Sequence, residues 1–189
     1  MPMPSQLPAR RPTPQISRGF TTLEILVTLS LIAILGAIAA PSMINFVRTN
    51  KMTSAARQLD ADMMLARREA IKRNTRVLVC PLGSTAGQCG TATTSAWASG
   101  WIVCYDADFD NQCDSGTSTN PNPIRQHAAL ESVLTLTGPA SVLRFNANGS
   151  QGASGAGSLT FTTRGNWTGS KSYVETITAT GNVSIAAGS

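Results

Sequence analysis

The chain has its longest apolar run near the amino terminus, from Phe20 to Ala40, directly before Pro41. As a helix, these roughly 21 residues would be about 31 Å long, which is close to the hydrocarbon thickness of a bilayer. Glu24 is the one ionisable side chain in the run. An unpaired carboxylate among lipid tails would cost on the order of 2 kcal/mol or more. The pattern therefore predicts a membrane-spanning helix in which Glu24 needs a partner.

Beyond Pro41 the pattern changes to that of an amphipathic helix, with apolar residues at steps of three to five along one stripe. The stripe consists of Ile44, Val47, Met52, Ala55, Leu59, Met63, Ala66 and Ala70. Because proline interrupts helical hydrogen bonding, we predict one long helix that is kinked near Gly36 and Pro41 and ends by about Asn74.

From Thr75 onward, short β-branched or aromatic runs alternate with clusters of Gly, Pro, Asn and Ser, which is typical of strands. The predicted strands are Arg76–Cys80, Trp101–Tyr105, Ser132–Leu136, Val142–Phe145, Leu159–Thr162 and Tyr173–Thr178. A long helix followed by a group of short strands indicates an α+β fold, in which the amphipathic helix packs on an antiparallel sheet domain.

The residues before the apolar run are rich in proline and include Arg10, Arg11 and Arg18. Basic residues before a membrane segment predict a cytoplasmic amino terminus and an exported carboxyl-terminal domain. The chain has 15 basic and 10 acidic residues, and without these three arginines 12 basic residues remain. Such a small excess of positive charge does not indicate a strongly basic nucleic-acid-binding protein.

The sequence Gly19-Phe20-Thr21-Thr22-Leu23-Glu24, after a basic leader and before an apolar helix, resembles the class III signal of type IV pilins and pseudopilins. This resemblance implies that prepilin peptidase cuts between Gly19 and Phe20 and methylates the new amino terminus of Phe20. It also implies that Glu24 pairs with the terminal amine of a neighbouring subunit. The expected organisation is a cleaved leader (1–19), a transmembrane and assembly segment (20–41), an amphipathic helix (42–74) and a β-rich domain (75–189).

Two other interpretations of the apolar run stay open. A cleaved secretory signal would use Ala37-Ile38-Ala39 as its cleavage site, and an uncleaved signal anchor would leave Glu24 without a role. Either would fit a signal-anchored or secreted enzyme.

The middle of the chain resembles the H-type pseudopilins of type II secretion and the related FimT and FimU minor pilins. The resemblance rests on Leu65–Arg73, Val79-Cys80-Pro81, Trp97–Gly100, Trp101-Ile102-Val103 and Asp106-Ala107-Asp108. It implies a minor filament subunit in the inner membrane that contacts other pilin subunits, prepilin peptidase, an assembly platform and lipid. DNA-binding FimT proteins carry a Gly-Arg-x-Arg tail where this chain has Gly181-Asn182-Val183-Ser184, which lacks both arginines.

Four cysteines are consistent with an exported domain, where thiols oxidise. Cys80 and Cys89 are nine residues apart, as are Cys104 and Cys113. Of the three ways to pair four cysteines, we favour these two local disulfides. A zinc site is the alternative, but the chain lacks the C-x-x-C spacing and its single histidine, His127, is remote in sequence.

Asp106, Asp108 and Asp110 alternate as the first ligands of a calcium loop do, followed by Asp114. Asn111 stands where such a loop requires glycine, so a solvated acidic turn is the alternative. Calcium is the one cofactor that the sequence suggests.

Five basic residues lie near the predicted helix end: Arg67, Arg68, Lys72, Arg73 and Arg76. They would stabilise the carboxyl terminus of the helix, or they would contact DNA or lipid head groups if they shared one face.

The sequence offers no nucleophile, acid or base set, so we do not expect an enzyme. The prediction is a structural subunit of a type II secretion pseudopilus or a type IV pilus. The alternatives are a pilus-associated DNA-binding subunit and the signal-anchored or secreted enzyme.

Overall fold

The computed structural model describes residues 19–85, 87–116, 122–152 and 157–188, without the side chains of residues 39–41. The chain divides into two units, Met1–Met43 and Ile44–Ser189. Most of the predicted leader, residues 1–18, and the side chain of Pro41 therefore lie outside the described part of the chain.

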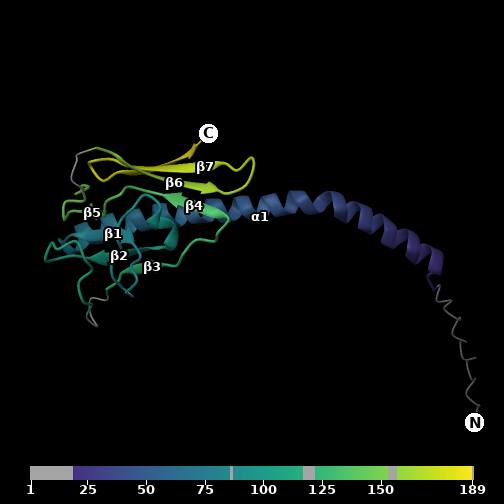
Figure 1. Cartoon of the computed structure of the whole chain (residues 1–189), viewed down its shortest axis with the longest axis horizontal. Coiled ribbons are helices and arrows are strands. Elements are labelled where there is room, and N and C mark those ends of the chain that lie inside the picture. The colour runs from purple at the N-terminus through teal and green to yellow at the C-terminus, as the bar shows by residue number, and fades with distance from the viewer. Residues whose placement is uncertain (1–18, 86, 117–121, 153–156, 189) are drawn as a thin grey trace, which may run out of the picture. The chain divides into compact units, whose positions relative to one another are not determined.

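Helix α1 covers Thr22–Arg73 and contributes to both units (Figure 1). In the second unit it ends at the predicted position, because Asn74 adopts a φ of 52°. This left-handed conformation lets the Thr75 amide donate a hydrogen bond of 3.2 Å to the Ala70 carbonyl. Asparagine is one of the few residues that accept such a conformation at low cost, so Asn74 terminates the helix.

The first sheet has the strand order β3-β2-β1-β5. All of its neighbouring strands pair in antiparallel fashion. The strands are β1 (Val77–Pro81), β2 (Trp101–Tyr105), β3 (Arg125–His127) and β5 (Leu143–Phe145), and the short 3-10 helix η1 (Ala96–Ser99) precedes β2. The sequence did not predict β3.

The second sheet has the order β4-β6-β7-β8 and is also antiparallel. Its strands are β4 (Leu134–Thr137), β6 (Leu159–Gly165), β7 (Ser172–Ile177) and β8 (Val183–Gly188). Strand β8 was not predicted. Figure 1 shows β4, β6 and β7 running along the part of α1 that belongs to the second unit.

The main core lies between α1 and both sheets. Leu59, Met63, Ala66 and Ala70 of the predicted stripe are fully buried. They belong to one cluster with side chains of η1 and both sheets, which include Trp97, Trp101, Phe145, Phe161 and Ile177. The predicted α+β architecture is therefore confirmed. Ile44 and Val47 of the same stripe are exposed, because the buried part of the helix begins at Met52.

Candidate functional site

The start of α1 carries the residues that the sequence singled out for processing. Gly19 and Phe20 precede the helix, and Phe20 is 77% exposed. The Glu24 amide donates a hydrogen bond of 3.2 Å to Thr21 Oγ1, so Thr21 caps the helix. Thr21-x-x-Glu24 is the capping-box spacing, and the Glu24 charge also suits the positive end of the helix dipole. The sequence contained this signal, but the role of Thr21 was not recognised.

The helix that follows exposes apolar side chains along its length. In the first unit these are Leu23, Ile25, Leu26, Val27, Leu29, Leu31, Ile32, Ile34, Leu35, Ile38 and Met43. Among the described residues, no single helix is long and apolar enough to cross a membrane, whereas the bent pair Thr22–Ile38 and Ser42–Arg73 meets this criterion by length and composition alone. A kink at Gly36 and Pro41 stays a prediction.

In the second unit, Asp62 is a fully buried carboxylate on the core-facing side of α1. Its Oδ2 accepts a hydrogen bond of 2.9 Å from Trp101 Nε1 and lies 2.8 Å from His127 Nε2. Its Oδ1 accepts a hydrogen bond of 2.9 Å from Arg125 Nη1. The rings of Trp101 and His127 also stack, with their centroids 4.7 Å apart. Asp62 therefore connects α1 to β2 and β3, a role that the sequence did not reveal.

The predicted basic cluster does not act as one group in the structure. Arg76 is buried and pairs with Asp106, and Lys72 and Arg73 both pair with Glu69. Arg67 Nη2 donates a hydrogen bond of 3.2 Å to the Thr180 carbonyl. Arg68 is exposed and forms no ion pair with any described residue. Most of these cations thus serve contacts within the domain.

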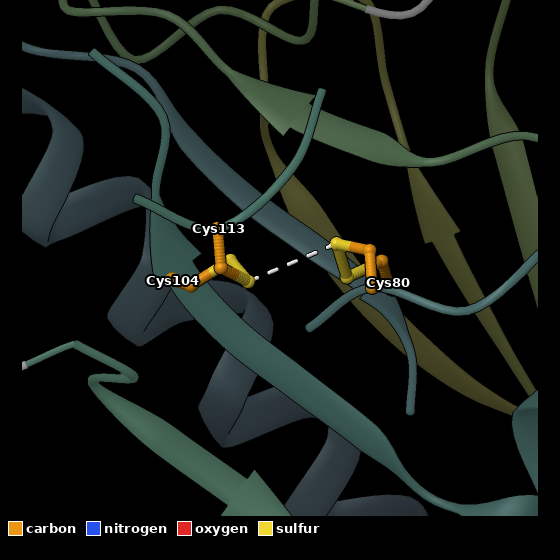
Figure 2. Close-up of side chains that lie close together, drawn as sticks. Cys80, Cys104 and Cys113 are labelled. Carbon is orange, nitrogen blue, oxygen red and sulfur yellow. Dashed lines mark hydrogen bonds between the residues drawn. A yellow bond between two sulfur atoms is a disulfide. The ribbon is translucent and has the colours of Figure 1, made fainter. Parts of the chain in front are cut away.

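The two disulfides are the local pairings that the cysteine spacing favoured. Cys80 bonds to Cys89 and Cys104 bonds to Cys113, each with Cα atoms 5.5 Å apart. Figure 2 shows that the two disulfides are neighbours, and the sulfur atoms of Cys89 and Cys113 lie 3.8 Å apart. The disulfides therefore fasten two successive loops at one place beside β1 and β2.

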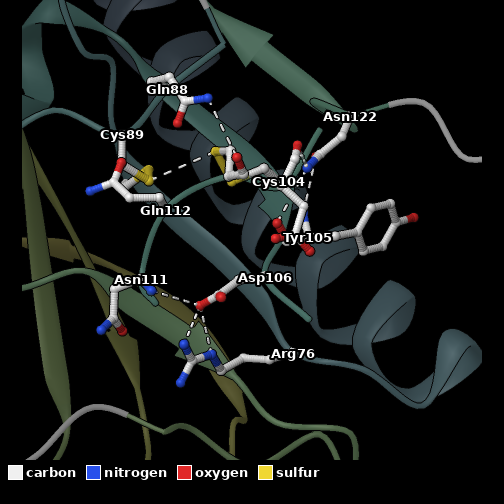
Figure 3. The surroundings of a disulfide bond; sticks show 12 residues. Arg76, Gln88, Cys89, Cys104, Tyr105, Asp106, Asn111, Gln112 and Asn122 are labelled. Atoms are coloured by element: carbon white, nitrogen blue, oxygen red, sulfur yellow. Dashed lines mark hydrogen bonds and ion pairs between the residues drawn. A yellow bond between two sulfur atoms is a disulfide. The ribbon is translucent and has the colours of Figure 1, made fainter. Parts of the chain in front are cut away.

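The acidic loop after β2 is organised by an ion pair (Figure 3). Asp106 is fully buried, and its Oδ2 accepts hydrogen bonds from the Arg76 guanidinium and, at 3.2 Å, from the Asn111 amide. The Arg76 guanidinium also lies 4.6 Å from the centre of the Phe109 ring. Burial raises the pKa of the Asp106 carboxyl, while the hydrogen bond from Arg76 opposes this effect.

Carboxylate oxygens of Asp106, Asp108 and Asp114 lie within 4.8 Å of one another. Asp114 thus joins the cluster in the place for which the sequence suggested Asp110. Arg76 already brings a positive charge to Asp106, which reduces the attraction of this loop for a cation. The sequence left two interpretations open, calcium binding at Asp106, Asp108 and Asp110 or a solvated acidic turn, and the ion pair with Arg76 favours the turn.

The chain is similar to known proteins in both sequence and fold. A family model described as "Type II transport protein GspH" matches residues 55–181. A crystal structure of the type IV minor pilin FimU from Pseudomonas aeruginosa matches with a TM-score of 0.51 and 23% identity over 75% of this chain and 92% of that chain. A second crystal form of FimU gives a TM-score of 0.48 and 23% identity over 71% and 91%. No curated protein matches the sequence.

Proposed function

This chain belongs to the GspH family and is a structural subunit of the minor pilin or pseudopilin kind, and from that premise we propose that it is made as an inner-membrane precursor, cut between Gly19 and Phe20, and assembled into a filament through α1. The filament is a type II secretion pseudopilus or a type IV pilus.

The observation that carries this proposal is the exposure of apolar side chains along the amino-terminal part of α1. A continuous apolar surface of this kind needs lipid or other helices to cover it. Lipid would cover the surface of a stored subunit, and the helices of neighbouring subunits would cover it in a filament.

The processing step uses the geometry at the start of α1. Gly19 and Phe20 are exposed and lie before the first helical residue, so the bond between them is accessible to a membrane peptidase. Cutting there creates an ammonium group on Phe20, and methylation keeps its charge. The carboxylate of Glu24 then pairs with the terminal amine of a neighbouring subunit, which removes the cost of burying either charge alone.

The proposed topology is a single pass through the inner membrane, with a cytoplasmic leader and a periplasmic domain. Two disulfides in the domain suit an oxidising compartment. The partners are other pilin or pseudopilin subunits, prepilin peptidase, the inner-membrane assembly platform and lipid. The role is structural, in filament assembly or initiation and so in secretion or pilus biogenesis, without catalysis by this chain.

DNA binding has less support as an alternative. The ion pairs of Arg76, Arg73 and Lys72 with acidic side chains leave few free cations at the end of α1. A DNA contact needs several cations on one face, and its affinity should fall steeply with salt.

The test of processing is the intact mass and amino-terminal sequence of the membrane-extracted protein, from cells with and without prepilin peptidase. We expect a methylated Phe20 terminus only when the peptidase is present. Gly19→Val should block cleavage, and Gly36→Ala, which changes a glycine inside the helix, should not. A terminus at Ala40, or the same uncut chain in both strains, would rule out the proposal.

Assembly requires a separate test with a processed variant. Glu24→Gln keeps the size of the side chain and removes its charge. We expect this variant to be cut and methylated but not to co-purify with filaments. The control Thr28→Val should be cut and methylated and should also co-purify with filaments. Normal incorporation of Glu24→Gln would remove the proposed role of this carboxylate.

A further inference from the structure

Glu175 of β7 is a buried carboxyl that neither the proposed assembly nor any predicted site uses. Only 1% of its surface is exposed, and neither of its carboxyl oxygens has a hydrogen-bond partner within the described residues. Asp60 of α1 lies near enough to Glu175 for charge repulsion, and its Oδ1 is also buried and unpartnered. Three carboxyl oxygens, one of Asp60 on the helix and two of Glu175 on the second sheet, are therefore buried without a hydrogen-bond donor among the described residues.

In the part of the chain that the structure describes, no cation forms an ion pair with Glu175. In the strand register, β6 places Phe161 opposite Glu175 and β8 places Ile185 opposite it. On α1, Arg67 and Arg68 line the same groove as Asp60, and Arg57 lies one helical turn before it. None of these three arginines forms an ion pair with Asp60 or Glu175 among the described residues. The two carboxyl groups are therefore close enough to repel each other, and neither has an ion-pair partner among the described residues.

Such a pair cannot carry two negative charges at low cost, because desolvation and mutual repulsion both favour the protonated form. Burial raises the pKa of Glu175 to about 9, and the charge of Asp60 acts in the same direction. Burial also raises the pKa of Asp60. At neutral pH, Glu175 is therefore protonated while the sheet is docked.

The pair lies within the line of contacts that holds the second sheet to α1. On one side of Asp60 along the helix, the hydroxyl groups of Thr53 and Tyr173 are 3.2 Å apart. On the other side, Arg67 binds the Thr180 carbonyl in the turn between β7 and β8. A groove of 580 Å³, lined in part by Asp60, Asn182 and Val183, opens between the helix and this turn. Separation of sheet and helix would widen this groove.

We propose that protonation of the Asp60–Glu175 carboxyl pair controls the docking of β6, β7 and β8 of the second sheet on α1, so that alkaline conditions loosen these three strands from the helix while the first sheet stays in place. The inference goes beyond the proposed assembly role and does not depend on which filament the chain joins.

The sign of the effect follows from proton linkage. The docked state keeps a proton that Glu175 loses to solvent once the sheet opens, because its pKa then returns towards the ordinary value of 4.5. Opening therefore becomes easier as the pH rises from about 4.5 to about 9, by up to about tenfold per pH unit for one group.

Hydrogen–deuterium exchange on the full-length chain in detergent tests this inference at several values between pH 6 and pH 9. After correction for the intrinsic exchange rate, we expect the protection of β7 and β8 amides in the wild type to fall by at least about tenfold over this range. Glu175→Gln should abolish this fall. Glu131→Gln, which changes an exposed glutamate outside this interface, should behave as the wild type.

Asp60→Asn provides a second variant, which removes the repulsion but keeps Glu175, and it should reduce the pH dependence without abolishing it. The inference is wrong if protection in the wild type and in Glu175→Gln follows the same pH profile. It is also wrong if β1 and β2 lose protection together with β7 and β8, because the pH would then affect the whole domain rather than the docking of one sheet.

Discussion

The hydroxyl of Tyr105 in β2 donates a hydrogen bond of 2.8 Å to Glu69 Oε2 on the last turns of α1. Arg73 completes this contact, because its Nε lies 2.8 Å from the same oxygen and its guanidinium lies 4.4 Å from the centre of the Tyr105 ring. The hydrogen bond from Tyr105 is the main reason why the pKa of Glu69 is lowered. Burial and the Glu69 carboxylate together raise the pKa of Tyr105 to about 12.

Tyr105→Phe should lower the free energy of unfolding by about 1–2 kcal/mol at neutral pH, since a hydrogen bond to a charged group is lost. The lowered pKa of Glu69 means that this stabilisation is present above the usual value of 4.5 and is lost as the pH falls through the folded-state pKa. Urea unfolding at neutral pH and near pH 3 should therefore show a difference from the wild type that shrinks in acid.

Tyr173→Phe is the matched control, because its hydroxyl contacts the neutral Thr53. Its effect should be smaller and should not depend on pH over this range. An effect of Tyr105→Phe that is equal at both pH values would contradict the role of the Glu69 charge.

Asp62→Ala should destabilise the domain by about 3 kcal/mol, because it leaves the Trp101 indole without an acceptor and removes the partner of two basic groups. Asp108→Ala removes an exposed aspartate of the acidic loop and should change the unfolding free energy by less than about 0.5 kcal/mol. Chemical unfolding monitored by tryptophan fluorescence measures the change in unfolding free energy for both variants. Equal effects of the two substitutions would show that the Asp62 network contributes little.

Gly181→Ala and Gly169→Ala separate backbone strain from a steric clash. The φ angles of these glycines are 77° and 78°. A Cβ on Gly181 would clash with the Gly149 carbonyl oxygen, whereas one on Gly169 would meet nothing within 4 Å. We expect a loss of about 1 kcal/mol for Gly169→Ala from the left-handed backbone, and a further 1–3 kcal/mol, roughly, for Gly181→Ala. Similar melting temperatures for the two variants would argue against the close approach of the two turns.

Removal of calcium should leave the melting temperature unchanged, because Arg76 already neutralises part of the charge on Asp106. The measurement compares the chain in chelator with the chain in millimolar calcium. A calcium-dependent increase that Asp114→Asn abolishes would instead establish the oxygen cluster of Asp106, Asp108 and Asp114 as a cation site.

Periodicity predicted the parts of the fold that depend on apolar residues near each other in sequence. The stripe from Met52 to Ala70 packs on both sheets, and each of the six predicted strands overlaps an observed one. Strand β3 has the sequence Arg-Gln-His, which shows no apolar alternation, and it forms through pairing with β2. Strand β8 contains mostly small residues and depends similarly on β7.

The polar contacts were harder to predict because their partners are far apart in sequence. Asp62 and Arg125 are separated by 63 residues, and Asp62 and Trp101 by 39. The five basic residues near the helix end do not share one face, because Arg76 lies beyond Asn74, where the chain has left the helix, and its side chain is buried. A helical projection cannot represent that change of direction.

The cap at Thr21 has a consequence for the maturation of the subunit. Cleavage after Gly19 would remove every residue before Phe20 and leave Thr21 and its hydrogen bond to the Glu24 amide in the mature chain. The helix thus carries its own start signal on the retained side of the cut. In the proposed processing step, leader removal would change the charge and the exposure of the amino terminus without unwinding the helix that is proposed to enter the filament.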